Sequence, residues 1–127
     1  MRVAVVPVLL ACCAVEVATA LHRPQDLPDM TWVGADAPRD ATVVVIAGTV
    51  THATAGMVQA AIDAAPAPRA VIAFGVCASS GGPYWDSHAV VQGIDADLFV
   101  PGCPPPPPAL WGAVARAATE VTAHAAR

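Results

Sequence analysis

Thr42-Val43-Val44-Val45-Ile46-Ala47 is the stretch that decides the fold. It is a continuous run of β-branched and apolar residues, without the polar alternation of a strand that faces water on one side. Such runs are typical of parallel strands that are buried on both faces. The sequence therefore predicts a mostly parallel sheet that is covered by helices on both sides.

Other short apolar runs are expected to join this sheet. A first strand is predicted over residues 2–10, a third over 70–76 and a short fourth over 97–100. Trp32 and Val33 form a possible edge strand in an otherwise polar segment. Strands that alternate with helix-like segments predict a doubly wound α/β architecture in a single domain, residues 1–127.

Two helices are expected between and after these strands. One covers Thr51 to Ala65 and is ended by Pro66, and the other begins at Pro108, where a missing backbone N–H costs nothing. Each segment places apolar residues on one helical face. These residues are Met57, Val58, Ala61 and Ile62 in the first helix, and Leu110, Val114, Ala118, Val121 and Ala125 in the second.

Composition restricts the classes of partner. Charged residues make up 13% of the 127 residues, against about 25% in an average protein, which favours a surface partly covered by partner subunits over a merely Ala-rich composition. The net charge of −4 and the absence of Lys or Arg runs argue against nucleic acid. No apolar stretch reaches the ~20 residues of a membrane-spanning helix, so any membrane association should come through a partner.

The N-terminus permits two interpretations. Arg2, an apolar run and Ala18-Thr19-Ala20 imitate a signal peptide, and Leu9-Leu10-Ala11-Cys12 imitates a lipoprotein processing site. Against both, Pro7 breaks the apolar run and cleavage after Ala20 would discard two cysteines. These features alone leave the two interpretations balanced.

The four cysteines are the strongest candidates for a site. They permit two disulfides, four free thiols or a metal site, and the adjacent Cys12 and Cys13 do not pair readily with each other because the ring would be strained. Ligands of doubly wound folds bind beyond the carboxyl ends of the strands. Cys12 and Cys13 follow the first predicted strand, Cys77 the third and Cys103 the fourth. The loops at one edge of the sheet should therefore bring all four thiols together.

The chemistry of four thiolates fits a 4Fe-4S cluster and also fits zinc. Zinc sites usually contain Cys-x-x-Cys pairs, and this sequence contains none. Gly75 and Gly102 permit tight backbone around a bulky cluster, and glycine amides can donate to its sulfurs. Glu16 can orient such a site or accept a proton, although from the residues alone an ordinary place in the first turn of a helix is favoured.

Other kinds of site find no support. The four histidines have no metal-like spacing and are interpreted as surface or capping residues: His22, His52, His88 and His124. Ser79-Ser80-Gly81 lacks the strand-to-helix elbow of a serine hydrolase. The sequence also lacks a glycine-rich phosphate-binding fingerprint.

Four blocks of the sequence form a set. The first is Leu10-Ala11-Cys12-Cys13-Ala14-Val15-Glu16, and the second is Pro38-Arg39 with residues 45–51. The third is Gly75-Val76-Cys77-Ala78-Ser79-Ser80-Gly81-Gly82 with residues 90–93, and the fourth is residues 97–105. Together and in this order, the blocks resemble the 20 kDa subunit of complex I, the NADH-quinone oxidoreductase. The related small subunits of NiFe hydrogenases usually have Gly-Pro-Val where this chain has Ala47-Gly48-Thr49.

The resemblance implies a flavodoxin-like fold that carries one 4Fe-4S cluster on Cys12, Cys13, Cys77 and Cys103. It matches Glu16 to the family's acid beside the tandem cysteines, and Gly102 is expected next to the last ligand. Because Cys12 and Cys13 would be ligands, the N-terminus is predicted to remain uncleaved. The loop from His22 to Leu27 departs from the family pattern, reading His-Arg-Pro-Gln where Met-Pro-Arg-Tyr is typical.

The resemblance also implies a function. The expected role is an electron-transfer subunit, not catalytic alone, that relays electrons toward quinone on the cytoplasmic side of a bacterial membrane. Its expected partners are a large catalytic subunit and iron–sulfur subunits, with quinone a candidate at the interface and no nucleic acid. The alternatives are a small subunit of a membrane-bound NiFe hydrogenase and a divergent assembly module that binds zinc or no cofactor.

Overall fold

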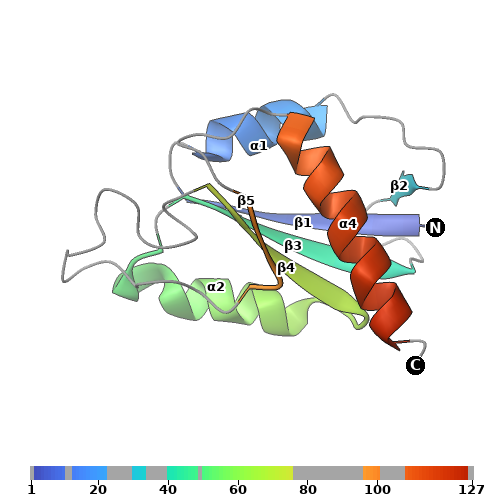
Figure 1. Cartoon of the computed structure of the whole chain (residues 1–127). Helices are drawn as coiled ribbons and strands as arrows, with labels where there is room; N and C mark the ends of the chain where they lie inside the picture. The colour runs from blue at the N-terminus through green and yellow to red at the C-terminus, as the bar shows by residue number, and fades with distance from the viewer. Residues whose placement is uncertain are drawn as a thin grey trace.

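The computed structural model describes residues 2–10, 13–22, 30–33, 40–48, 50–75, 96–100 and 108–125. Within these ranges, five parallel strands form one sheet in the order β2-β1-β3-β4-β5 (Figure 1). This is the strand order of flavodoxin-like doubly wound folds, so the predicted fold class is confirmed. The strands are β1 (Arg2–Leu9), β2 (Thr31–Val33), β3 (Ala41–Ala47), β4 (Arg69–Phe74) and β5 (Leu98–Val100).

Helices cover both faces of this sheet. Helices α1 (Cys13–His22) and α4 (Pro108–Ala125) lie on one face, and α2 (His52–Ala64) lies on the other (Figure 1). Both helices expected from the sequence therefore form, and the predicted ends agree with the observed ones to within one residue. None of the described helices is long and apolar enough to cross a membrane.

Strand β3 lies in the middle of the sheet and is buried along its whole length. Successive side chains of a strand point to opposite faces. Val43 and Val45 accordingly pack with Leu110 and other residues of α1 and α4, whereas Val44 and Ile46 pack on the side of α2. The continuous apolar run at residues 42–47 thus reflects two cores, one on each face.

Trp111 connects α4 with two other elements. Its buried indole Nε1 donates a hydrogen bond to the carbonyl of Ala20 in α1, at 3.2 Å. Its ring also lies against Trp32 of β2, with ring centroids 4.7 Å apart. The predicted edge strand at Trp32 and Val33 is confirmed. Through its two contacts, Trp111 holds both this strand and the end of α1 against α4.

The start of α2 is defined by a reciprocal capping box. The backbone N–H of Thr54 donates to the hydroxyl of Thr51 at 3.2 Å, and the N–H of Thr51 donates to the hydroxyl of Thr54 at 3.0 Å. This arrangement satisfies two backbone groups that a helix end leaves unpaired. At the other end, Arg69 donates to the carbonyl of Ala65 at 3.1 Å, which helps to satisfy the last turn.

One predicted helix face is partly wrong. Met57 of α2 is 54% exposed, whereas Val58 is buried against the sheet. Consecutive residues are separated by about 100° of helical rotation, and α2 is turned so that Val58, with Ala61 and Ile62, faces the strands. Met57 therefore lies outside the contact.

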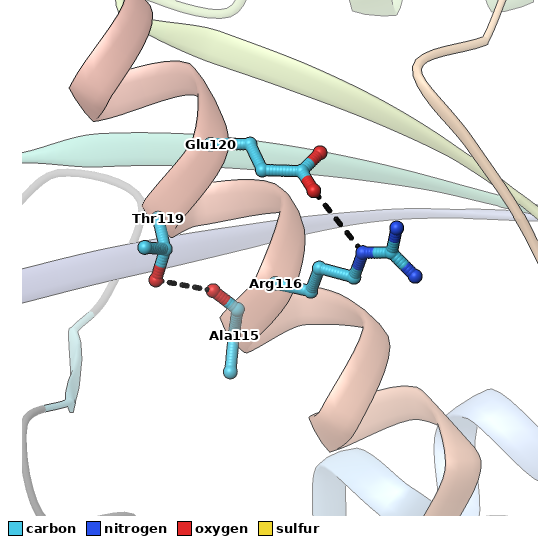
Figure 2. Close-up of polar contacts among 4 residues, drawn as sticks. All are labelled: Ala115, Arg116, Thr119 and Glu120. Atoms are coloured by element: carbon cyan, nitrogen blue, oxygen red, sulfur yellow. Dashed lines mark hydrogen bonds and ion pairs between the residues drawn. The ribbon is translucent and has the colours of Figure 1, made fainter.

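The face predicted for α4 is confirmed at Leu110, Val114 and Ala118, which are buried, and Val121 is half-buried. The opposite side carries polar residues (Figure 2). Arg116 Nε and Glu120 Oε1 are 3.1 Å apart, and both side chains are exposed. Exposed pairs of this kind contribute roughly 0–1 kcal/mol. The position of α4 is therefore determined by its apolar face.

Strand β3 is attached to β1 at its first residue by Asp40. The N–H of Asp40 donates to the carbonyl of Arg2 at 2.8 Å, and the N–H of Arg2 donates to Asp40 Oδ2 at 2.7 Å. The second bond lowers the pKa of Asp40 below its usual value, and the charge of the Arg2 guanidinium lowers it further. The two bonds place Ala41 opposite Val3, which is the first step of the register between these strands.

Candidate functional site

The carboxyl ends of four strands lie in one row across the sheet. Leu9 of β1 pairs with Ala47 of β3, Ala47 pairs with Phe74 of β4, and Phe74 pairs with Val100 of β5. Because all four strands are parallel, the chain leaves the sheet at the same edge each time, which is where doubly wound folds bind ligands. Neighbouring strands lie about 4.8 Å apart, so the ends of β1 and β5 are separated by about 14 Å.

Three of these row residues stand at the same distance in sequence from a cysteine. Leu9 lies three residues before Cys12, Phe74 three before Cys77, and Val100 three before Cys103. Cys12, Cys77, Cys103 and Gly102 lie outside the described residues. The strand ends expected in front of the thiols are thus confirmed, while the ligand assignment itself stays a prediction.

Helix α1 begins at the tandem cysteines. Cys13 is its first residue and Glu16 lies in its first turn, although neither side chain is described. The helix follows β1 within a few residues, so its N-terminus lies near the carboxyl edge of the sheet (Figure 1). Unpaired N–H groups and the helix dipole make such an end favourable for negative charge.

The backbone at this edge depends on two glycines. Gly48 after β3 has a φ of 112° and Gly75 after β4 has a φ of 95°, and both residues are buried. The N–H of Gly75 donates to the carbonyl of Val100 at 2.8 Å, which extends the pairing of β4 with β5 beyond the row. Gly75 therefore adopts a backbone conformation that favours glycine, while its place around a cluster stays a prediction.

Replacing Gly75 by Ala should lower the free energy of unfolding by about 1–2 kcal/mol, because a residue with a Cβ is strained at this φ. Gly112 offers a matched control, since it is exposed in α4 and an added Cβ there meets nothing within 4 Å. Gly112→Ala should raise stability by about 0.5–1 kcal/mol. Urea unfolding measures both changes, and a Gly75→Ala variant as stable as the wild type would contradict the strain.

Apolar surface is exposed close to the same edge. Val15 of α1 is 65% exposed and Leu9 at the end of β1 is 45% exposed. Val15 also lines an open groove with Ala18, Thr19 and His22. This surface agrees with the shortage of charged residues in the sequence. Its part at Val15 lies on the helix that begins at Cys13.

The described residues contain no alternative metal site. No three His, Cys, Asp or Glu side chains of this part of the chain lie close enough together to hold a metal ion. His22 and His52 are exposed, as the sequence predicts. His88 lies outside the described residues, and the side chain of His124 is not described.

The sequence analysis places Asp97 in one of the four blocks but assigns it no role at the site. The structure gives it one. Its N–H donates to the carbonyl of Val71 in β4 at 2.8 Å, and its Oδ2 accepts a hydrogen bond from the N–H of Val71, also at 2.8 Å. These bonds hold the start of β5 on β4. An aspartate at the start of the predicted strand 97–100 is the only sequence signal for such a contact.

Comparisons with known proteins agree with this arrangement. The family described as NADH ubiquinone oxidoreductase, 20 Kd subunit, matches residues 11–117. One of the B-type subunits of NADH-quinone oxidoreductase from Salinispora tropica is 41% identical over an alignment of 122 residues that covers 92% of this chain and 65% of that protein. Its counterpart from Amoebophilus asiaticus is 40% identical over an alignment of 119 residues that covers 90% of this chain and 74% of that protein.

The chain thus spans slightly less than two thirds of the length of the Salinispora relative. Among solved structures, a chain of the membrane-bound sulfane sulfur reductase, an archaeal respiratory membrane complex, superposes with a TM-score of 0.64. That match covers 97% of this chain and 71% of the other at 20% identity. It shows that the two chains share a fold.

Proposed function

The chain belongs to the family of the 20 kDa subunit of NADH ubiquinone oxidoreductase, and on this premise we propose that it is the electron-transfer subunit that carries one 4Fe-4S cluster in a complex I-like enzyme. The proposed ligands are Cys12, Cys13, Cys77 and Cys103. The observation that supports this most strongly is the row of strand ends, because a cysteine follows three of its residues at the same interval.

The dimensions of this edge suit four thiolates around one cluster. Three residues of extended chain reach at most about 10 Å, and the outer ends of the row are about 14 Å apart. Loops from β1, β4 and β5 can therefore meet above the middle of the row. There Gly48 follows β3 and Gly75 follows β4, so no Cβ projects from these two positions.

Charge at this edge also suits the cluster. A cluster held by four thiolates carries net negative charge, and the N-terminus of α1 at Cys13 favours an anion. We assign to Glu16 the role of accepting a proton, or a hydrogen bond, beside the tandem cysteines. We assign to the amide of Gly102 a hydrogen bond to a cluster sulfur, which would tune the reduction potential.

When bound, the cluster supplies one-electron transfer, and the residues of this chain hold it, orient it and exclude water from it. Electrons would come from an iron–sulfur partner and pass toward quinone at the interface with a large catalytic subunit. This chain makes and breaks no bond in the substrate. It would act as a peripheral subunit on the cytoplasmic side of the membrane.

The exposed apolar surface supports the proposal of a docked partner. Val15 and Leu9 lie beside the edge where the cluster would bind, and exposed apolar patches commonly mark interfaces. A large subunit seated there would shield the cluster from water and oxygen. The low proportion of charged residues is consistent with the same cover.

Anaerobic affinity purification of the chain from its native host tests the function. Beyond the iron and sulfide of co-purified iron–sulfur subunits, we expect about four iron and four acid-labile sulfide per chain. We also expect a paramagnetic resonance signal after reduction, and a co-purified large subunit without nickel. Zinc in place of iron would identify an assembly module, and stoichiometric nickel with hydrogen-dependent dye reduction would identify a hydrogenase. A mature chain that begins at Cys12 or Leu21, read by mass spectrometry, would contradict the ligand set.

A further inference from the structure

Two aspartates make the same pair of hydrogen bonds at different places in the sheet. Each stands immediately before a strand, donates its N–H to the carbonyl of a residue in the neighbouring strand, and accepts the N–H of that same residue on its carboxylate. Asp40 pairs in this way with Arg2 of β1, and Asp97 pairs with Val71 of β4. We call this pair of bonds an aspartate clamp.

The strands that follow the two clamps differ in how firmly other contacts hold them. Strand β3, after Asp40, has seven buried residues and pairs with β1 on one side and with β4 on the other. Strand β5, after Asp97, has three residues and pairs with β4 at the edge of the described sheet. The Asp40 clamp is therefore one of many contacts, whereas the Asp97 clamp is a large part of what holds β5.

Side-chain burial also does little to set the register of β5. Phe99 is 49% exposed and Leu98 is only half-buried, so Val100 is the single buried residue of this strand. A slip of one residue would turn Val100 toward the opposite face. It would also shift the point from which the chain leaves for Cys103 by about 3.3 Å along the strand.

We propose that Asp97 is the positioning residue for the last cluster ligand. By holding Leu98 opposite Ile72, its clamp places Val100 level with Phe74. The segments that lead to Cys77 and Cys103 therefore begin from paired residues. The hydrogen bond from Gly75 to Val100 closes the other end of the same pair of strands. The inference rests on the proposed function, because it concerns a residue that acts through a proposed ligand.

The test compares four variants of the full chain, each purified anaerobically with its co-purifying subunits. Asp97→Ala removes the carboxylate, Asp97→Asn keeps an acceptor oxygen without charge, and Asp97→Glu keeps the charge but moves it by one methylene. Asp40→Ala removes the matching clamp between β1 and β3. It is the control because seven further residue pairs keep these two strands in register without it. The measurements are iron per chain, the resonance signal of the reduced cluster, and amide hydrogen exchange over residues 98–100.

We expect Asp97→Ala to lose most of the iron that this chain itself holds, or to show a shifted resonance signal. It should also exchange the amides of β5 about tenfold faster. Asp97→Asn should resemble the wild type, and Asp97→Glu should resemble Asp97→Ala. Asp40→Ala should keep its iron and its signal. If Asp97→Ala does not fold, the Asn and Glu variants still test the proposal. A positioning role predicts that Asp97→Asn keeps more iron than Asp97→Glu. If only the charge mattered, Asp97→Glu would keep more iron than Asp97→Asn.

Full iron and an unchanged signal in Asp97→Ala would overturn the proposal. An equal loss of iron in Asp40→Ala would also overturn it, because the effect would then be general destabilisation. A wild-type chain without iron is a different outcome. It would reject the proposed function, and the positioning role would be rejected with it.

Discussion

Replacing Cys77 or Cys103 by Ser should abolish or strongly perturb the resonance signal of the reduced cluster. Each thiolate is expected to hold one iron, and a serine hydroxyl does not ionise readily enough to replace it. Loss of a partner outside the ligand sphere already costs about 10–100-fold in metal affinity, so the loss of a ligand should exceed that. The two residues follow β4 and β5, whose ends Phe74 and Val100 are paired in the row.

The measurement is paramagnetic resonance on anaerobically reduced protein, together with iron and sulfide content. His88→Ala is the control, because His88 stands between these cysteines in sequence and is assigned no ligand role. It should keep the full signal. A wild-type signal in Cys77→Ser or in Cys103→Ser would exclude that residue as a ligand and would leave the proposed set incomplete.

Phe74→Ala should lower the free energy of unfolding by about 3–5 kcal/mol, the usual cost of removing a fully buried aromatic ring. Phe74 is the last residue of β4, has no exposed surface, and belongs to the core beneath α1 and α4. Small domains are stable by only about 5–15 kcal/mol. The substitution therefore removes a large share of the total stability, and it does so at the strand end that precedes Cys77.

The sequence contains a second phenylalanine that serves as a matched control. Phe99 of β5 lies opposite Ala73 in the adjacent strand but is 49% exposed. Since about half of the residue is already exposed to water, Phe99→Ala should cost less than about 1.5 kcal/mol in the isolated chain. Urea unfolding followed by circular dichroism gives both values. Equal losses in the two variants would show that the core is not centred beneath α4 as described.

Much of the fold could be predicted because its signals are local. The β-branched runs predict β1, β3 and β4 within two residues of their observed ends, since an apolar run of strand length needs no distant partner to be recognised. Pro108 marks the start of α4 for a similarly local reason, the missing N–H that only a first turn tolerates. Met57 was placed wrongly, because helical spacing defines a face but not how the helix is turned against the sheet.

The features of the candidate site also fall into two groups, those that the sequence predicts and those that only the folded structure shows. The cysteines, their order and their places after strands can be read from the sequence, and so can the resemblance that assigns them to one cluster. The contacts that align the strand ends cannot, because they join residues far apart in the chain. Asp97 bonds to a residue 26 positions away, Asp40 to one 38 away, and Trp111 to one 91 away.

The strands, the helices α2 and α4, and the family of this chain therefore follow from its residues alone, because each depends on residue types at short spacing. The strand order, the row that joins Leu9, Ala47, Phe74 and Val100, and the clamp at Asp97 emerge only in the folded chain. The physical reason is that register between parallel strands is set by packing on both faces of the sheet and by hydrogen bonds across long connections. Those energies exist only once the two segments lie side by side.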